Sequence, residues 1–577
     1  MPTINVSWED LSKLTLKGLT VKQISELPCE VDDNLIYKDE LEDLIFLNKG
    51  EVEKWDGDNI EIEITSDRID LLSTEGFARA IRGYLGIEVG FPFYSIEKSN
   101  VDLVVDPSVN QVRPYIVSGI IENIEFSDAH VAQIMQAQEK LHATHSRNRK
   151  QASIGLHDLN KIVPPITYCA KKPEDIKFIP LHETEEMNGR EILEKIQKGR
   201  EYKYIIDKSP VYPILHDSKG TILSLPPIIN SVDTAVTPET RNLFFDITCL
   251  NKKIANYALN VLVCNIAERN GQIKSVNIKY PDHTEILPDL TPQKRDLHLN
   301  YVNKILGLNL TIDELKNLIL KARMNFEEIN KNKLLVQIPA YRSDNHHEID
   351  LIESIAIAYG FDNYIPEIPK ILTVGSEDAF ESFVRKIKYF LIGLGYQELH
   401  NYIMTNKKTL FEKMNRNEND FPFIEIANPI SSSFAILRND LIPLGLDFLS
   451  KNTHATLPIK VFETGDVLKH NEELETKVEQ IRQLVIILTD FSVSFENIQE
   501  ILFSLMNYMN LQCILTKKDE LLLIKGRGAN ININKEPVGE IGEISLDILE
   551  NFNLINPVCI MKLNLNNIYN LLKEEFK

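Results

Sequence analysis

Three acidic residues lie within one short segment, at spacings that could bring their carboxylates together. Asp344 precedes a helical pattern, and Asp350 and Glu353 stand three residues apart within it, so the last two project from one face of the helix. Converging carboxylates repel each other by roughly 1 kcal/mol or more per pair, and a hard oxygen-seeking ion such as Mg²⁺ relieves this repulsion. The spacing therefore allows a magnesium site, but it also fits an ordinary solvated acidic face.

A run of basic residues, from His142 to Lys150, is a second candidate for chemistry. Such a cluster could contact the phosphates of an RNA, or it could be a solvated loop, and the sequence leaves both open. The net charge of −21 argues against general nucleic-acid binding, because an acidic surface repels phosphates. If RNA is a substrate, we expect another chain or a few basic patches to hold most of it.

The six cysteines lie far apart and form no CxxC pair, which argues against a zinc site and against a disulfide framework. No apolar run reaches the roughly 18 residues that cross a membrane. The first residues, MPTINVSWEDL, lack the basic start and apolar run of a secretory signal. We therefore expect a cytoplasmic protein that does not enter a membrane.

A capped helix is expected to position the acidic segment. Asn345 can serve as its N-cap with Glu348 as the reciprocal partner. Ile349 and Ile352 are then expected to face the core with Ala356 and Tyr359, and Gly360 is expected to end the helix.

Changes in the apolar pattern divide the 577 residues into four blocks, which we expect to be four domains: 1–95, 100–275, 288–365 and 370–577. The first mixes short strands with a helix near 71–86, and the second alternates strands with a helix near 129–141. The third reads helix, helix, strand, helix, with a capping box at Thr311 and Glu314. The last returns to mixed strands and helices, so the predicted fold class is α+β multidomain.

Within these blocks the predicted strands are short apolar runs bounded by turn residues. A long helix near 379–394 is predicted to end at Gly395. The predicted strands include residues 115–121, 152–155, 221–225, 334–338, 424–427, 458–462, 484–488 and 558–561.

The segment Ile338-Pro-Ala-Tyr-Arg-Ser-Asp-Asn-His-His-Glu-Ile-Asp-Leu-Ile-Glu, which ends in Ala-Tyr-Gly at Gly360, resembles the B5 domain signature of phenylalanyl-tRNA synthetase beta subunits. This resemblance implies an Mg²⁺ ion near the interface with an alpha subunit, held by Asp344, Asp350 and Glu353. A fourth position, usually acidic in that family, is Ser354 here, and one carboxylate fewer weakens a divalent site.

The resemblance extends over nearly the whole chain and is better to the archaeal and eukaryotic cytosolic type than to the bacterial type. Residues 66–76 resemble the family's B1 domain. Residues 154–159, 212–218 and 223–230 resemble its B3/B4 editing domain, and the His142–Lys150 run resembles a stretch before it. The last block resembles B6/B7, a degenerate copy of the class II synthetase core, at residues 428–431, 437–443 and 462–466.

The resemblance implies the beta subunit of an ATP-dependent phenylalanine–tRNA ligase, paired with a catalytic alpha subunit in an α2β2 heterotetramer that binds tRNA(Phe). An active class II core needs arginines that clamp the ATP phosphates. Arg438 is the only arginine in its motif, and Gly526-Arg527-Gly528 is predicted to form a turn. The last block is therefore expected to be a non-catalytic scaffold for the alpha subunit.

The resemblance also implies that the second block hydrolyses tyrosine wrongly attached to tRNA(Phe). A synthetic pocket shaped for phenylalanine rejects an analogue with one added hydroxyl by only about 100-fold, so a second sieve is useful. His157 and Asp158 lie in the editing motif, and Asp246 could meet the tyrosine hydroxyl. The wall-forming loop carries Ser224, Pro226, Pro227 and Asn230. A structural role for His157 and Asp158, as residues that fasten a turn, stays open.

Two other functions compete with this one. The first is a stand-alone RNA-binding or scaffold protein without editing activity. The second, a hydrolase with a catalytic metal at residues 344–353, is weaker because no Ser, His or Lys nucleophile accompanies the acids at a suggestive spacing. Co-purification of an alpha subunit at equal stoichiometry would separate the ligase subunit from the stand-alone protein.

Overall fold

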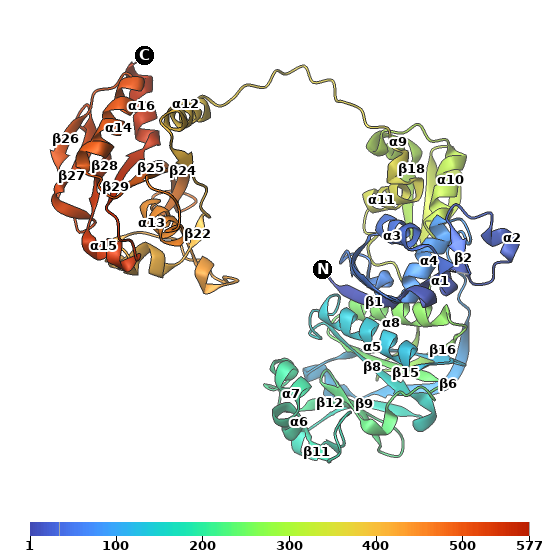
Figure 1. Cartoon of the computed structure of the whole chain (residues 1–577). Helices are drawn as coiled ribbons and strands as arrows, with labels where there is room; N and C mark the ends of the chain where they lie inside the picture. The colour runs from blue at the N-terminus through green and yellow to red at the C-terminus, as the bar shows by residue number, and fades with distance from the viewer. Residues whose placement is uncertain (34, 576–577) are drawn as a thin grey trace. The chain divides into compact units, whose positions relative to one another are not determined.

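The computed structural model describes residues 1–33 and 35–575, and it divides into two compact units, Met1–Glu367 and Ile368–Lys577. The residues at the boundary, 364–378, are in neither helix nor strand (Figure 1). Within the part of the chain that is described, no helix is long and apolar enough to cross a membrane.

The first unit begins with a three-stranded antiparallel sheet in the order β1 (Thr3–Ser7), β5 (Asn59–Ile64), β4 (Gly50–Asp56). Alternation along β5 buries its three isoleucines completely. The helix predicted near 71–86 is confirmed as α4 (Thr74–Tyr84), which buries Phe77 and Ile81, and Gly86 follows it at φ +73°. The helices beside the sheet are α1 (Trp8–Leu16), α3 (Lys38–Leu47) and α4.

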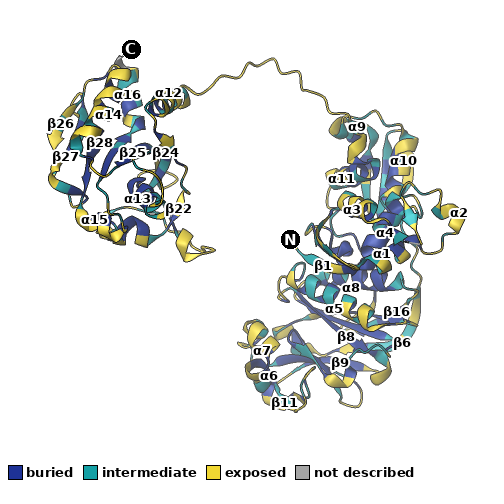
Figure 2. Ribbon diagram, viewed as in Figure 1, coloured by how far each residue is buried: buried dark blue, intermediate teal, exposed yellow. Residues whose placement is uncertain are grey.

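A ten-stranded sheet forms the largest part of this unit, in the order β14-β13-β12-β9-β6-β16-β7-β15-β8, with β17 paired to β16. Every residue of β8 and β15 is buried, as expected for strands that are covered on both faces, and Figure 2 shows buried residues along these strands. The helix predicted near 129–141 is confirmed as α5 (Asp128–Ala143), and α8 (Lys252–Ala267) also packs here. The strands are β6 (Ile96–Val105), β7 (Tyr115–Glu122), β8 (Ala152–Asp158), β9 (Ile166–Lys171), β12 (Tyr212–His216), β13 (Ile222–Leu225), β14 (Ile229–Asn230), β15 (Leu243–Cys249), β16 (Gln272–Lys279) and β17 (Thr284–Leu287).

The third block is a three-stranded sheet with three helices. The predicted helices are present, and the Thr311 capping box is confirmed at α10. The prediction missed β18 and β19, because the polar sequences QKRDLH and NFEEIN give no clear apolar alternation at the sheet edges. The elements are β18 (Gln293–His298), α9 (Leu299–Leu306), α10 (Ile312–Lys321), β19 (Asn325–Asn330), β20 (Lys333–Ile338) and α11 (Glu348–Tyr359).

The N-cap of α11, the helix of the acidic segment, lies two residues after the predicted N-cap. Its N-cap is His347 with Asp350 as the reciprocal partner, so the predicted Asn345–Glu348 cap is wrong. The predicted burial of Ile352 and Ala356 is confirmed, but Ile349 is 39% exposed, and Leu351 and Ile355 are buried in addition. The predicted end at Gly360 is confirmed, with φ +90° at that glycine.

One continuous apolar core runs from Ile4 to Leu287 and includes Tyr341. Buried polar contacts also join the first block to the second. Asn265 on α8 donates to Ser73 Oγ over 2.9 Å, and Arg269 pairs with Asp10 over 2.6 Å. The four-domain division stays a prediction, and the first two of its blocks share this core.

The second unit holds a seven-stranded sheet in the order β21-β24-β25-β29-β28-β27-β26. Leu484 and Ile486 of β25 pack with α12, α14 and α16, while Val485 and Ile487 pack with α13 and α15, so helices cover both faces of the sheet. The elements are α12 (Ala379–Gly393), β21 (Gln397–Glu398), α13 (Ile442–Lys451), β24 (Ile459–His470), β25 (Val478–Thr489), α14 (Phe495–Tyr508), β26 (Ile514–Lys517), β27 (Leu523–Ile533), β28 (Glu536–Ile544), α15 (Leu546–Asn551), β29 (Val558–Asn564) and α16 (Leu565–Glu575).

Most predicted elements of this unit are confirmed, including the helix near 379–394 and the strands near 458–462, 484–488 and 558–561. Two predictions are wrong. Residues 424–427 form only an isolated bridge, between Glu425 and Ile436. The Gly526-Arg527-Gly528 sequence lies inside β27 and not in a turn, because a bulge with Gly526 at φ +82° lets the strand continue. The predicted α+β class is confirmed.

Candidate active site

A cavity of about 310 Å³ lies against the ten-stranded sheet, where β8, β13 and β15 meet the loop that follows β13. It brings together the residues predicted for the wall-forming loop and the acid predicted to meet the tyrosine hydroxyl: Ser224, Pro226, Pro227, Asn230 and Asp246. Much of the remaining lining is apolar, with Val131, Met135, Ile154, Leu156, Ile228 and Ile229. A mostly apolar cavity with few polar groups is typical of a binding site for an apolar side chain with one polar end.

Asp246 is the buried acid of this cavity, with 1% of its surface exposed. Its Oδ2 accepts hydrogen bonds from Ser224 Oγ over 2.9 Å and from His157 Nε2 over 2.8 Å. Gly155 is its neighbour on β8, and a Cβ at Gly155 would lie 2.6 Å from Asp246 Oδ2. Gly155 therefore leaves the space that the carboxylate occupies, a role that the sequence analysis missed.

His157 lies behind the carboxylate and does not line the cavity. It is fully buried, and its Nδ1 lies 2.8 Å from Thr234 Oγ1. Because an ionised carboxylate can only accept, His157 Nε2 donates to Asp246 when that acid is ionised. His157 is a positioning residue for Asp246.

Asp158 and Asn230, the other two predicted editing residues, have different places. Asp158 Oδ1 accepts from the backbone N–H of Asn160 and its Oδ2 accepts from Thr240 Oγ1, so it fastens a turn outside the cavity. Asn230 lines the cavity and donates from Nδ2 to the carbonyl oxygen of Leu156 over 3.1 Å. The structural role left open for His157 and Asp158, that of fastening a turn, therefore fits Asp158.

The basic run before β8 contributes a buried arginine to the cavity wall. Arg149 is 4% exposed, and its Nη1 donates to the carbonyl oxygens of Pro227 and Ile228 over 3.1 and 2.9 Å. Its Nη2 pairs with Glu139 over 2.8 Å. The backbone at residues 147–149 is left-handed throughout, which turns this side chain inward. Arg149 is therefore not part of a solvated loop, and its guanidinium is not free to contact a phosphate.

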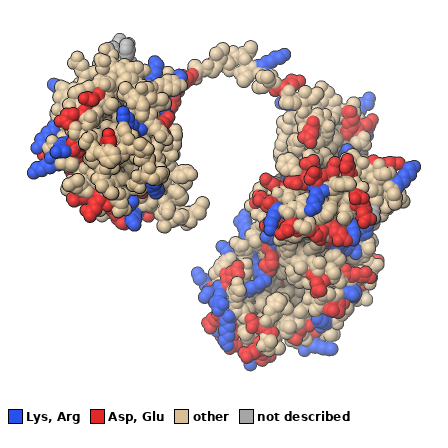
Figure 3. Space-filling view, viewed as in Figure 1, with Lys and Arg blue, Asp and Glu red and all other residues tan. Residues whose placement is uncertain are grey.

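Exposed basic residues nevertheless gather beside the cavity. Helices α6 (Gly189–Lys195) and α7 (Gln197–Tyr202) carry them, and Figure 3 shows Lys and Arg side chains on this part of the surface. They are Arg190, Lys195, Lys198 and Arg200, and Lys198 also lines the cavity.

A buried histidine supports the same wall from within. His142 Nε2 accepts the backbone N–H of Ile154 over 2.7 Å, and burial lowers the pKa of His142 to about 4. Burial alone would raise the pKa of Glu139, but the contact with His142, whose Nδ1 lies 3.7 Å from Glu139 Oε2, and the charge of Arg149 hold it well below its usual range. Protonation of His142 would remove the acceptor that holds β8.

We expect the stability of the first unit to fall as the pH drops from about 6.5 to about 4. The folded pKa of His142 lies below the unfolded value of 6.5, so this contribution is complete above pH 6.5 and is lost as pH falls through the folded pKa. The loss should reach about 3 kcal/mol. Both tryptophans, Trp8 and Trp55, lie in this unit, so their fluorescence in urea reports its unfolding.

His142→Gln should flatten this pH dependence, because it removes the titrating group. His400→Gln, at a histidine with 75% of its side chain exposed, should leave the pH dependence unchanged. An unaltered slope in His142→Gln would refute the assignment.

The three acids predicted to share Mg²⁺ each have a separate partner. Asp344 Oδ2 pairs with Arg342 over 2.7 Å, and although burial alone would raise the pKa of Asp344, Arg342 holds it well below its usual range. Asp350 Oδ2 accepts two backbone N–H groups at the start of α11, and Glu353 pairs with Lys49 over 3.0 Å. The structure does not bring the three carboxylates together.

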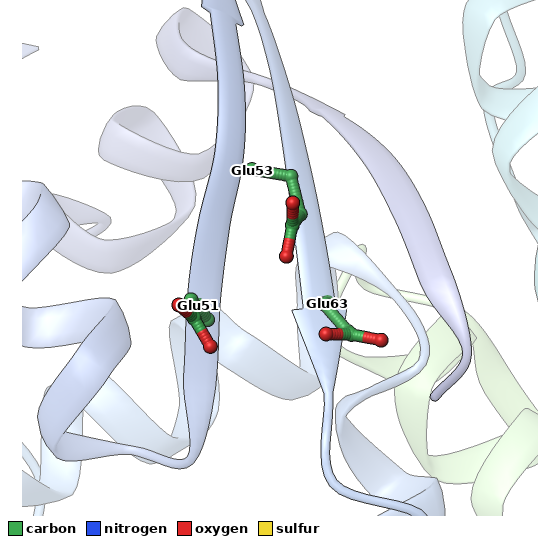
Figure 4. A group of neighbouring side chains, drawn as sticks. All are labelled: Glu51, Glu53 and Glu63. Atoms are coloured by element: carbon green, nitrogen blue, oxygen red, sulfur yellow. The ribbon is translucent and has the colours of Figure 1, made fainter. Parts of the chain in front are cut away.

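The one place where three metal-ligating atoms lie within 4.8 Å of each other, in the described ranges 1–33 and 35–575, is elsewhere. It consists of Glu51 and Glu53 on β4 and Glu63 on β5 (Figure 4). Two of these side chains are exposed, and Glu63 pairs with the N-terminal ammonium of Met1 over 2.7 Å. This cluster needs no metal to account for it.

In the second unit, the arginine that could serve an ATP site is held inside the protein. Arg438 is 4% exposed, and its Nη1 donates to Glu463 over 2.6 Å while its Nε donates to the carbonyl oxygen of Asp466 over 2.8 Å. Arg527, on β27, pairs with Glu543 over 2.6 Å. Neither guanidinium is placed as a free clamp for phosphates.

Comparisons with known proteins agree along the chain. Family models match at residues 1–87 (Phe-tRNA synthetase beta subunit B1 domain), 141–270 (B3/4 domain), 295–361 (tRNA synthetase B5 domain) and 365–565 (phenylalanyl tRNA synthetase beta chain CLM domain). The phenylalanine–tRNA ligase beta subunit of Pyrococcus furiosus is 38% identical over 99% of this chain and all of its own length. That of Korarchaeum cryptofilum is 38% identical over 92% of this chain and 95% of its own length.

A solved structure matches as well. The crystal structure of an N-terminal fragment of the Pyrococcus horikoshii phenylalanyl-tRNA synthetase beta subunit is 38% identical, with a TM-score of 0.57. It covers 62% of this chain and all of that fragment. The resemblance stated from the sequence is confirmed.

Proposed function

This chain belongs to the family of phenylalanine–tRNA ligase beta subunits, and we propose that its cavity at Asp246 removes tyrosine wrongly attached to tRNA(Phe). The observation that supports this function is the buried Asp246 carboxylate, which Ser224 and His157 orient at a cavity with mostly apolar walls. A phenol ring fits the apolar walls, and its hydroxyl finds an acceptor in the carboxylate.

The same carboxylate protects the correct product. Phenylalanine has no hydroxyl, so its entry would displace water from Asp246 without offering a new donor. A buried polar group that loses a partner in this way costs about 1–3 kcal/mol, and more when it is charged. The cavity therefore selects tyrosine by the one atom that distinguishes it from phenylalanine.

The reaction is hydrolysis of an ester. Water adds to the carbonyl carbon of the tyrosyl group, the bond between that carbon and the terminal ribose oxygen breaks, and the ribose oxygen takes a proton. Tyrosine and free tRNA leave. In this mechanism Asp246 binds the side chain, His157 and Ser224 hold Asp246, and Arg149 fixes the Pro227–Ile228 wall.

The assembled ligase tests this proposal directly. It should hydrolyse Tyr-tRNA(Phe) much faster than Phe-tRNA(Phe) when each is supplied at equal concentration. Equal and slow hydrolysis of both would show that this cavity does not edit.

A beta subunit belongs to a larger ligase, and we propose that this chain pairs with a catalytic alpha subunit, binds tRNA(Phe) and assembles as an α2β2 heterotetramer. The internal ion pairs of Arg438 and Arg527 support a non-catalytic second unit. Lys198, which lines the editing cavity, and Arg200 on the same helix offer phosphate contacts at its edge. The mass of the purified complex and its subunit stoichiometry test the assembly.

Magnesium at Asp344, Asp350 and Glu353 stays a prediction, and the three side chains as placed do not fit a shared ion. Ser354 adds no carboxylate, and its hydroxyl is already used in two hydrogen bonds. Its Oγ accepts from Arg342 Nη2 over 3.1 Å and donates to the carbonyl oxygen of Asp350. A guanidinium already neutralises Asp344, so the repulsion that would call for a cation is relieved.

These contacts give a definite expectation for Asp350→Asn. The change weakens the reciprocal cap of α11 and should lower the unfolding free energy of the first unit by about 1 kcal/mol. The magnesium content of the assembled ligase, measured by elemental analysis, should not change. Loss of bound magnesium in this variant would instead establish Asp350 as a ligand.

A further inference from the structure

A second, smaller cavity of about 40 Å³ lies where α4, α10 and α11 approach each other in the first unit. Four arginines line it, and all are buried: Arg68, Arg79, Arg323 and Arg342 are 2–7% exposed. Burying four guanidinium groups around one small space is costly unless acceptors satisfy them.

Two of the four arginines each form a bidentate pair with one carboxylate. Asp70 binds Arg68 through two hydrogen bonds of 2.8 and 2.9 Å, and Asp344 binds Arg342 through two of 2.8 and 2.7 Å. Each of these pairs is neutral. The cavity therefore owes its uncompensated positive charge to its other two arginines.

Arg79 and Arg323 have weaker carboxylate contacts. Arg79 Nη1 lies 3.6 Å from Glu268, and Arg323 Nη2 lies 3.2 Å from Glu88, a carboxylate that Arg82 also contacts at 3.2 Å. Glu88 serves two guanidinium groups, so five guanidinium groups at and beside the cavity (those of Arg68, Arg79, Arg82, Arg323 and Arg342) face only four carboxylates.

Three buried donors at this cavity lack a hydrogen-bond acceptor among the described residues. They are the hydroxyl of Tyr341, a residue that is 3% exposed, and Nε and Nη2 of Arg323. Nε of an arginine can only donate, and a phenol donates readily, so the missing partner is an acceptor. The Tyr341 ring is itself fixed in place, because the Arg79 guanidinium stacks 3.9 Å above it.

We propose that this cavity binds a small inorganic anion, a halide or an oxyanion of the size of phosphate. One water needs roughly 10–15 Å³ of such space, so the cavity has room for an ion of a few heavy atoms and not for an organic ligand. An anion supplies the acceptor that Tyr341 and Arg323 lack. It also compensates positive charge, whereas a water molecule, which is neutral, could only accept the hydrogen bonds.

The anion would join two parts of the chain that are distant in sequence. Arg68 and Arg79 belong to the first block, and Arg323, Tyr341 and Arg342 belong to the third. Binding should therefore stabilise the packing of α4 against α10 and α11. The proposal is independent of the editing function, because none of these residues lines the cavity at Asp246.

The first experiment locates the ion without any substitution. Crystals of the assembled ligase are soaked in bromide, and diffraction is recorded at the bromine absorption edge. An anomalous peak within hydrogen-bond distance of Tyr341 Oη identifies a halide site. A tetrahedral density there in phosphate-soaked crystals identifies an oxyanion site. Water alone under both conditions overturns the proposal.

The second experiment measures binding in the full chain. Tryptophan fluorescence follows thermal unfolding of the first unit while chloride or phosphate replaces gluconate, which is too large for the cavity, at constant ionic strength. At least one of the two anions should raise the midpoint in a saturable way. Tyr341→Phe keeps the ring under Arg79 but removes the hydroxyl, and it should weaken the apparent affinity at least about tenfold.

Tyr364→Phe is the matched control. Its hydroxyl is also buried and lacks a hydrogen-bond partner among the described residues, but it does not line the cavity. This variant should bind the anion as the natural chain does. Equal affinity in the Tyr341→Phe chain, or no saturable effect of either anion on the natural chain, would contradict the proposal.

Discussion

Asp246→Ala is expected to abolish the preference of the assembled ligase for Tyr-tRNA(Phe) over Phe-tRNA(Phe) in hydrolysis. The substitution removes the acceptor for the tyrosine hydroxyl at a position where only 1% of the residue is exposed. A hydrogen bond to a charged group contributes about 1.5–3 kcal/mol, which corresponds to a loss of roughly 10- to 150-fold in kcat/KM for the tyrosyl substrate. Hydrolysis of Phe-tRNA(Phe) should not fall in parallel.

Three related variants make the interpretation specific. Asp246→Asn keeps an acceptor oxygen in the cavity and should retain part of the preference. His157→Ala leaves Asp246 present but less well held, so it should raise KM for the tyrosyl substrate more than it lowers kcat. Asp158→Ala removes an acid next to His157, at the end of β8, that does not line the cavity, and it should leave the ratio of the two rates unchanged. A full tyrosine preference in Asp246→Ala would show that another group recognises the hydroxyl.

The purified chain alone is expected to charge tRNA(Phe) at least about a thousandfold more slowly than the assembled ligase. Arginines that stabilise a transferring phosphoryl group are worth roughly that much or more. In the second unit Arg438 is buried against Glu463 and Arg527 is paired with Glu543, so neither is placed for this task.

The corresponding experiment measures attachment of phenylalanine to tRNA(Phe) by the chain with and without the alpha subunit. Addition of that subunit should restore the full rate. Arg438→Lys should leave the affinity of the assembled ligase for ATP unchanged. Robust charging by the chain alone would place a ligation site in it.

Local patterns predicted the elements that have strong periodicity or clear end signals. The helix α4 with Gly86, the helix α5 and the capping box at Thr311 follow from the sequence nearby, and the structure confirms them. The edge strands β18 and β19 do not follow in this way, because charged and polar residues interrupt their apolar alternation. Strand pairing with β20 decides their conformation.

The contacts of the candidate site could likewise be predicted from the sequence only in part. The resemblance placed Asp246 and Ser224 in one region, and the structure brings them within 2.9 Å. The resemblance gave no sign that Lys49 pairs with Glu353, which lies 304 positions later. It also gave no sign that Arg149 turns inward to hold Pro227. Such partners are fixed by tertiary packing, so spacing along the chain could not reveal that the acidic trio is divided among separate contacts.

The continuous core between Ile4 and Leu287 limits how this chain can be dissected. A piece that starts near residue 100 would expose the apolar side of α8 and leave Arg269 without Asp10 and Glu75. Such a piece should aggregate when it is expressed by itself, although the editing cavity lies wholly within it. Residues 1–367 are the shortest portion in which we expect that cavity to survive isolation, and protease should cut the chain first within residues 364–378.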